Sequence, residues 1–292
     1  MQNELTVCII CSGFGGEFDT QFVWVACMQC GGSGIITAAD HIRKDHKVGI
    51  KYVTLTGADD SVYPQEILEL AQLFPFAEWG ILVAPQSPSR SRFPSYGWIK
   101  KLCELNRENG NQLRLSLHLC GGYLEQLAHG ELPLVHTLGP YFRDFQRCQL
   151  NWHGERTTAT AAAITAAFEQ LRPEWAPEVI FQLDGVNDEL AFECAKLMPH
   201  VSGLLDRSHG AGIVPERWPP ADDYLIPVGY AGGLGPENLI VEIPDILAMA
   251  AGTNIWIDME TNLFARGADG VQWYFSIARA ACCLATAKPY TV

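Results

Sequence analysis

Short apolar runs alternate with longer amphipathic segments from residue 50 to the end of this 292-residue chain. Each run is five to seven residues long, which suits strands that are buried on both faces. Several intervening segments repeat apolar residues at helical spacing, namely 64–74, 97–108, 160–171 and 188–197. Pro64 suits the first position of the first of these helices. The predicted strands are 50–56, 79–84, 113–119, 148–152, 179–184, 201–206, 225–231 and 254–259.

Eight strands, each followed by a helix or a short helical segment, predict a (β/α)8 barrel over residues 48–292. An open, doubly wound sheet is the alternative, although it usually has fewer strands. In a barrel, the C-terminal ends of the strands meet at one mouth, where active sites lie. Polar residues and glycines gather at these ends: Thr56-Gly57, Gln86-Ser87, Gly121-Gly122, Asp184-Gly185, Asp206, Gly232-Gly233 and Glu260. We therefore expect one pocket built from residues that are distant along the chain.

Residues 1–47 carry two copies of a CxxCxGxG unit, 19 residues apart, and we expect them to form a small zinc-binding module and linker. Two CxxC turns complete a tetrahedral site, and four thiolates leave no open position, so the zinc would be structural. The ligands would be Cys8, Cys11, Cys27 and Cys30. The repeat resembles the cysteine-rich zinc module of DnaJ-type co-chaperones. The alternatives are a mixed site of Cys27, Cys30, His41 and His46, a redox CxxC pair, or an unliganded extension.

Composition and charge narrow the function classes. The formal net charge of -13 argues against a nucleic-acid partner. No apolar run reaches the roughly 20 residues that span a bilayer, so we expect no membrane segment. The N-terminus lacks the basic region and long apolar stretch of a secretory signal. Together with the scattered cysteines, this predicts a cytoplasmic protein in a reducing compartment.

The segment Val228–Ile240 gives the clearest indication of a ligand. An apolar run ends in Gly232 and Gly233, and Pro236 and Glu237 then begin a predicted helix. Free backbone amides and a helix N-terminus both favour an anion. The sequence therefore predicts a small phosphorylated metabolite as the ligand and no organic cofactor.

Four segments, in order, resemble phosphoribosylanthranilate isomerase, a single-domain barrel of tryptophan biosynthesis. They are ILVAPQSPSRSR (Ile81–Arg92), CQLNWHGE (Cys148–Glu155), LLDRSHGAG (Leu204–Gly212) and AGGLGPEN (Ala231–Asn238). The last matches the family's seventh-strand motif without a change. The resemblance covers about residues 50–280 and implies isomerase-type acid–base chemistry, an Amadori rearrangement, on a phosphorylated sugar derivative.

The resemblance also implies roles for single residues. Asp206 matches the family's acid, and Gly232 and Gly233 match its phosphate-binding amides. Arg90 or Arg92 matches the arginine that pairs with the substrate carboxylate. Two positions depart from the family: Thr56 stands where the catalytic cysteine belongs, and Glu260 and Asn262 replace small residues at the phosphate site. A threonine hydroxyl accepts a proton at neutral pH only with a strong base beside it.

Other side chains at the expected mouth are further candidates. His118 and Cys120 lie on one strand face, where either could supply the missing base or both could bind a soft metal. His209 could ionise or hydrogen-bond a ligand, and His153 and Glu155 could act as an acid–base pair. An acidic cluster could bind a divalent ion in a metal-dependent lyase or hydrolase: Asp184, Asp188, Asp206, Asp258 and Glu260. A third hypothesis is a non-catalytic barrel that binds a phosphoribosyl-type metabolite while the zinc module docks a partner protein.

Overall fold

The computed structural model describes residues 48–85, 92–132, 134–152, 156–206, 212–267 and 273–292, together with the backbone of four short strands nearer the N-terminus. These four form two antiparallel pairs: β1 (Thr6–Val7) with β4 (Ile35–Ile36), and β2 (Gly16–Phe18) with β3 (Trp24–Ala26). Cys8, Cys11, Cys27 and Cys30 lie outside the described residues, as do His41 and His46. The zinc module and its boundary at residue 47 stay predictions.

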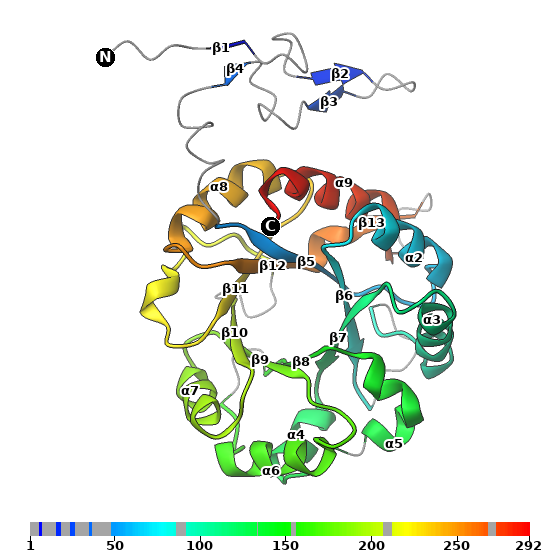
Figure 1. Cartoon of the computed structure of the whole chain (residues 1–292), viewed down its shortest axis with the longest axis vertical. Helices are drawn as coiled ribbons and strands as arrows, with labels where there is room; N and C mark the ends of the chain where they lie inside the picture. The colour runs from blue at the N-terminus through cyan, green and yellow to red at the C-terminus, as the bar shows by residue number, and fades with distance from the viewer. Residues whose placement is uncertain are drawn as a thin grey trace.

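Eight parallel strands close into a barrel, which confirms the predicted (β/α)8 fold and excludes the open sheet (Figure 1). Each strand pairs with its neighbours in chain order, and the last pairs with the first. The strands are β5 (Ile50–Thr56), β6 (Ala77–Val83), β7 (Arg114–Leu119), β8 (Arg147–Leu150), β9 (Glu178–Leu183), β10 (Val201–Leu205), β11 (Val228–Ala231) and β12 (Ile255–Met259).

The helices surround this barrel (Figure 1). They are α2 (Pro64–Leu73), α3 (Tyr96–Glu108), α4 (Gly122–Ala128), α5 (Leu134–Leu138), α6 (Ala161–Leu171), α7 (Asp188–Leu197), α8 (Leu239–Met249) and α9 (Ile277–Ala287). The 3-10 helices are η1 (Gly139–Asp144), η2 (Ala221–Asp223), η3 (Thr261–Leu263) and η4 (Lys288–Tyr290). A hairpin of β13 (Phe264–Arg266) and β14 (Trp273–Phe275) precedes α9. In the part of the chain that is described, no helix is long and apolar enough to cross a membrane.

Two predicted helix starts have different outcomes. Helix α2 begins at Pro64, as predicted, because proline has no amide hydrogen to leave unpaired there. The predicted start at Pro236 is wrong, since α8 begins at Leu239 and residues 236–238 form a turn. The Asn238 side chain accepts a hydrogen bond from the Gly235 amide at 2.9 Å and donates to the Gly233 carbonyl at 2.8 Å. These two bonds hold the turn that delays the helix.

The two faces of the barrel wall differ in polarity. Side chains that point outward, such as Val53 and Leu55, belong to the main apolar core between strands and helices. The inward face has a much smaller apolar cluster of Ile180, Leu204, Ala231 and Trp256, with Tyr52 packed against it. The remaining inward positions are largely polar or charged. The barrel interior is therefore where the chemistry-bearing side chains of this fold gather.

Candidate functional site at the barrel mouth

A cavity of about 50 Å³ opens at the C-terminal ends of the strands. Asp206, Gly232, Gly233 and Glu260, which were predicted to meet there, all line it. Polar side chains from other strands complete the lining: Thr56, His118, Gln149, Asn151, Gln182, Asp258, Thr261 and Asn262. A space of this size holds only a few water molecules or ligand atoms below the rim. The single-mouth prediction is thus correct for these residues.

Asp258 is the most perturbed acid of the site. Burial raises the pKa of its carboxyl well above the usual value, and the nearby charges of Glu260 and Glu78 add to the rise. A hydrogen bond from Thr56 and the charge of Arg147 oppose this increase. The Thr56 hydroxyl donates to Asp258 Oδ1 at 2.8 Å. Burial is the largest of these effects, so Asp258 stays protonated to a higher pH than an ordinary aspartate does.

The surroundings of Thr56 indicate what this residue does at the position where a catalytic cysteine was expected. The sequence left Thr56 as a candidate base, but its hydroxyl is turned toward Asp258 and lies beside the imidazole of His118. Both groups crowd Gly80: a β-carbon there would be 2.2 Å from Thr56 Oγ1 and 2.9 Å from His118 Nε2. Glycine at position 80 is what lets the threonine and histidine side chains share this space. Thr56 therefore acts as the hydrogen-bond partner of a buried acid.

Asp206 and Asp258 occupy equivalent positions on two strands that flank β11. Ala231 pairs with Asp258, and Leu205 pairs with Tyr230, so Asp206 follows at the level of Ala231. The Gln182 side chain donates to Asp206 Oδ2 at 3.0 Å and orients that carboxylate. Both carboxyl groups are at least nine-tenths buried and line the cavity. The small Ala231 side chain leaves the space between them open.

The glycine pair after β11 forms a tight turn beside these acids. Gly232 and Gly233 have φ values of 120° and 63°, which side-chain-bearing residues rarely adopt. A β-carbon at Gly233 would meet the Val214 backbone at 2.5 Å, so the neighbouring loop excludes any larger residue. Among the described residues, nothing accepts a hydrogen bond from the amides of Gly232, Gly233 or Leu234. No acceptor in the described part of the chain therefore competes with a ligand for these three amides.

Arg92 and Glu260, two predicted binding residues, bind each other. Arg92 Nη1 lies 2.8 Å from Glu260 Oε1, and its guanidinium stacks on Phe264 at 4.8 Å from the ring centroid. The two side chains are 33% and 31% exposed, so solvent screens this pair and a ligand can compete for either partner. The negative charge of Glu260, which the sequence suggested would repel a phosphate, is balanced by Arg92.

The His118 and Cys120 pair separates into two environments. His118 lines the cavity, whereas the Cys120 thiol packs with Leu82 and Ala84. Burial raises the pKa of Cys120 to about 12, although a hydrogen bond from Asn151 lowers it somewhat. A thiol with this pKa stays protonated at neutral pH, which disfavours Cys120 as the base.

Several other sequence predictions have no structural test. Arg90, His153, Glu155 and His209 lie outside the described residues.

The predicted acidic cation site is not formed: in the part of the chain described, no three His, Cys, Asp or Glu side chains are arranged to hold a metal ion. Asp258 was predicted only as a member of that cluster. Its pairing with Thr56 was missed because the two residues are 202 positions apart.

Comparisons with known proteins give similarity in fold alone. No protein-family model matches the chain, and no curated protein matches it. Phosphoribosyl anthranilate isomerase from Thermotoga maritima is 14% identical over 82% of this chain and 100% of its own, with a TM-score of 0.49. A GH113 β-1,4-mannanase is 9% identical over 82% and 98%, with a TM-score of 0.46. An enolase protein from the Sargasso Sea environmental genome is 16% identical over 76% and 57%, with a TM-score of 0.40.

Proposed function

We propose that this barrel is an isomerase-type acid–base catalyst that acts on a small sugar derivative at its mouth. The observation that carries the proposal is the row of Asp206, Ala231 and Asp258 across three adjacent strands. Neighbouring strands lie about 4.8 Å apart, so the two aspartate backbones are separated by roughly 10 Å. Their carboxyl groups reach inward from either side of Ala231, where the reacting end of a ligand would fit.

The two aspartates would have opposite roles. Thr56 donates to Asp258 Oδ1, so the acid proton of Asp258 is carried by Oδ2. Asp206, oriented by Gln182, would take a proton from the carbon next to a carbonyl group. The released electron pair forms the carbon–carbon double bond while the carbonyl oxygen takes the proton of Asp258. In the second half of the reaction, the other enediol hydroxyl gives its proton to Asp258 as its carbonyl group forms, and Asp206 delivers its proton to the former carbonyl carbon. Both aspartates then have their starting protonation states. The sequence prediction made Asp206 the acid, and the burial of Asp258 is what moves that role.

A phosphate group on the substrate is supported by the turn after β11. Gly232, Gly233 and Leu234 line the cavity, and no described residue accepts a hydrogen bond from their amides. Such amides bind an anion well. The local charge permits this, because Arg92 balances Glu260 and burial favours the neutral form of Asp258. Arg92 would orient a second anionic group of the ligand by exchanging Glu260 for it.

Solvent proton exchange tests the proposal on any sugar whose C2 proton the site can remove. The purified protein is incubated in D2O with a panel of aldoses and aldose phosphates, and loss of the C2 proton signal is followed by NMR. Phosphoribosylanthranilate is tested separately, by tryptophan-independent growth of a strain that lacks its isomerase. We expect exchange with at least one phosphorylated sugar.

Variants of the two aspartates locate the activity. Asp206→Asn and Asp258→Asn should each lower exchange by about 100-fold or more while ligand-induced thermal stabilisation is retained. Asp184→Asn is the matched control, because Asp184 is a buried carboxylate at the end of β9 that does not line the cavity. Absence of exchange across the panel in folded protein, or full activity of Asp206→Asn, would contradict the proposal.

A further inference from the structure

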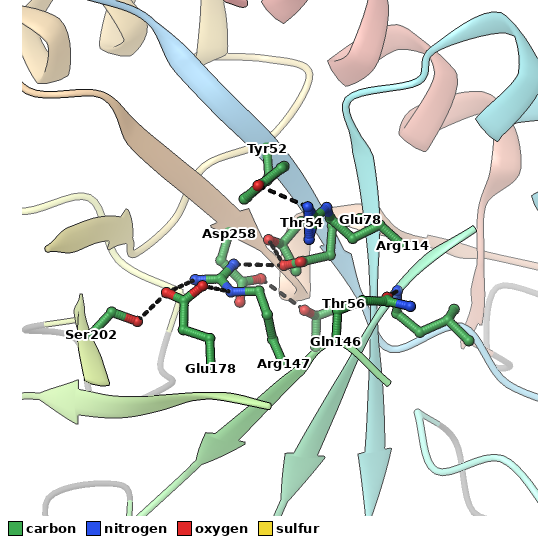
Figure 2. Close-up of polar contacts among 11 residues, drawn as sticks. Tyr52, Thr54, Thr56, Glu78, Arg114, Gln146, Arg147, Glu178, Ser202 and Asp258 are labelled. Atoms are coloured by element: carbon green, nitrogen blue, oxygen red, sulfur yellow. Dashed lines mark hydrogen bonds and ion pairs between the residues drawn. The ribbon is translucent and has the colours of Figure 1, made fainter. Parts of the chain in front are cut away.

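A buried ionic cluster lies inside the barrel, nearer the N-terminal ends of the strands (Figure 2). Arg147 Nη1 donates to Glu78 Oε1 at 2.8 Å, and the two side chains are 1% and 0% exposed. Arg147 Nε lies 3.3 Å from Glu178 Oε2, and the Ser202 hydroxyl donates to Glu178 at 2.5 Å. Taking a charged pair out of water is costly, and apolar residues can often replace it without loss of stability. The fold by itself therefore does not require these charges.

Glu78 and Arg147 each contact a residue that lies two positions from Asp258 or from its hydrogen-bond partner Thr56. On β5, Thr54 donates to Glu78 Oε1 at 2.9 Å, while Thr56, two residues further along the same face, donates to Asp258. Arg147 crosses the interior from β8, and its guanidinium carbon is 4.1 Å from the ring centroid of Trp256. Trp256 precedes Asp258 by two residues on β12, so it shares the inward face with that acid.

We propose that Glu78 and Arg147 form a positioning pair that governs the charge state of Asp258. The catalytic meaning of this inference rests on the proposed function, in which Asp258 is the acid. Among the described residues, the charged or titratable side chains that face Asp258 come from five places in the barrel: Glu260 directly after β12, Glu78 on β6, His118 on β7, Arg147 on β8 and Asp206 directly after β10. Of these, Glu78 and Arg147 are the pair that lies beneath the cavity floor and does not line it.

The two charges act on Asp258 in opposite directions. Glu78 disfavours a second negative charge in the barrel, whereas Arg147 favours it. While they are paired, each reduces the effect of the other, and the burial of Asp258 keeps its proton in place. Without the charge of Glu78, Arg147 would stabilise the Asp258 carboxylate more strongly, although it would still be paired with Glu178. The pair thus leaves burial to decide the charge state of Asp258, and burial favours the protonated form that the proposed reaction requires.

The test is a direct titration of Asp258, followed by the carbon-13 NMR signal of its carboxyl group, which Asp258→Asn identifies. Glu78→Gln removes the charge but keeps an acceptor for Thr54. We expect it to lower the titration midpoint by about one pH unit, a tenfold increase in the ionisation constant. Arg147→Lys withdraws the cation from Trp256 and should raise the midpoint by about half a unit. Asp144→Asn, which weakens an ion pair with Arg107 outside the barrel, is the control and should leave it unchanged.

Opposite shifts in the first two variants would support the inference, because a merely structural pair would not produce them. An unchanged midpoint in folded Glu78→Gln would overturn it, and if that variant does not fold, an unchanged midpoint in Arg147→Lys would do so. The titration needs no substrate, so the two proposals fail separately. If the Asp258 midpoint shifts in Glu78→Gln and Arg147→Lys but Asp258→Asn keeps full turnover, only the proposed function fails. If Asp258→Asn loses turnover but the midpoint does not shift in the other two variants, only the positioning role fails.

Discussion

Replacement of Arg147 by methionine tests how strongly the barrel interior depends on its buried ion pair. Methionine fills part of the arginine volume but cannot pair with the carboxylate of Glu78, which is 0% exposed. The hydrogen bond that Thr54 donates to this carboxylate remains. One oxygen of Glu78, Oε2, already has no partner among the described residues. The variant therefore leaves the buried carboxylate of Glu78 without the guanidinium that pairs with it.

The expected cost is about 3–5 kcal/mol, the usual result of removing one partner of a buried pair. Globular domains unfold with about 5–15 kcal/mol, so this is a large share of the total. For a barrel of this length, each kcal/mol lowers Tm by about 2–4 °C, which predicts a fall of roughly 6–20 °C. Urea unfolding followed by circular dichroism, with unchanged m-values, measures the free energy directly.

The double variant Glu78→Leu with Arg147→Met completes the cycle. It removes both charges, so we expect it to recover at least about 2 kcal/mol of the loss, although Thr54 and Glu178 each lose a partner. Arg107→Met is the matched control, because the Arg107–Asp144 pair is partly exposed and should contribute about 1 kcal/mol or less. A cost below about 1 kcal/mol for Arg147→Met, or simple additivity in the double variant, would refute the reasoning.

Three further predictions concern the site and the N-terminal repeat. Burial raises the pKa of Asp258 above its unfolded value of about 3.9, so this carboxyl adds stability below that pH and loses it as the pH rises through the folded pKa. Asp258→Asn should therefore be more stable than the wild type at pH 8 and should show a flatter dependence of Tm on pH. Gly80→Ala would place a methyl group 2.2 Å from Thr56 Oγ1, so it should destabilise the barrel by about 1–3 kcal/mol and abolish the proposed exchange activity. Elemental analysis of protein purified without chelator should find about one zinc ion per chain, lost when the cysteines of either CxxC are replaced by serine.

Each of these has a control and an opposing result. Parallel pH profiles for wild type and Asp258→Asn would argue against a buried, protonated acid. Gly97→Ala is the control for Gly80→Ala, since the nearest atom to its added methyl group is Ser95 Oγ at 3.8 Å and it should be neutral or slightly stabilising. Protein without zinc would remove the proposed metal module.

Most of the barrel could be predicted from local patterns. Each of the eight predicted strands overlaps an observed strand, because the outward positions of a barrel strand pack against the helices and are apolar in a short, regular pattern. The boundaries were less accurate at charged residues. Glu78, Arg147 and Glu178 were left outside the predicted strands, yet β6, β8 and β9 include them. A charge next to an apolar run normally indicates solvent, and nothing local in these three segments suggests otherwise.

The candidate site divides in the same way. Asp206 and the Gly232–Gly233 turn could be placed at the mouth from the sequence, since each lies where a predicted strand ends. The importance of Asp258 could not, because it depends on Thr56 and Gly80, which come from strands at the other end of the chain. The Arg92–Glu260 pair likewise joins residues 168 positions apart.

The sequence by itself thus determined the number of strands, their order and the positions that end at the mouth, because these follow from the local alternation of apolar and polar residues. Only the closed barrel decided which charges are neutralised and which acid keeps its proton. Burial and pairing are properties of the whole interior, and closure of the last strand on the first is what brings Asp258 next to Thr56 and near Arg147 and Glu78.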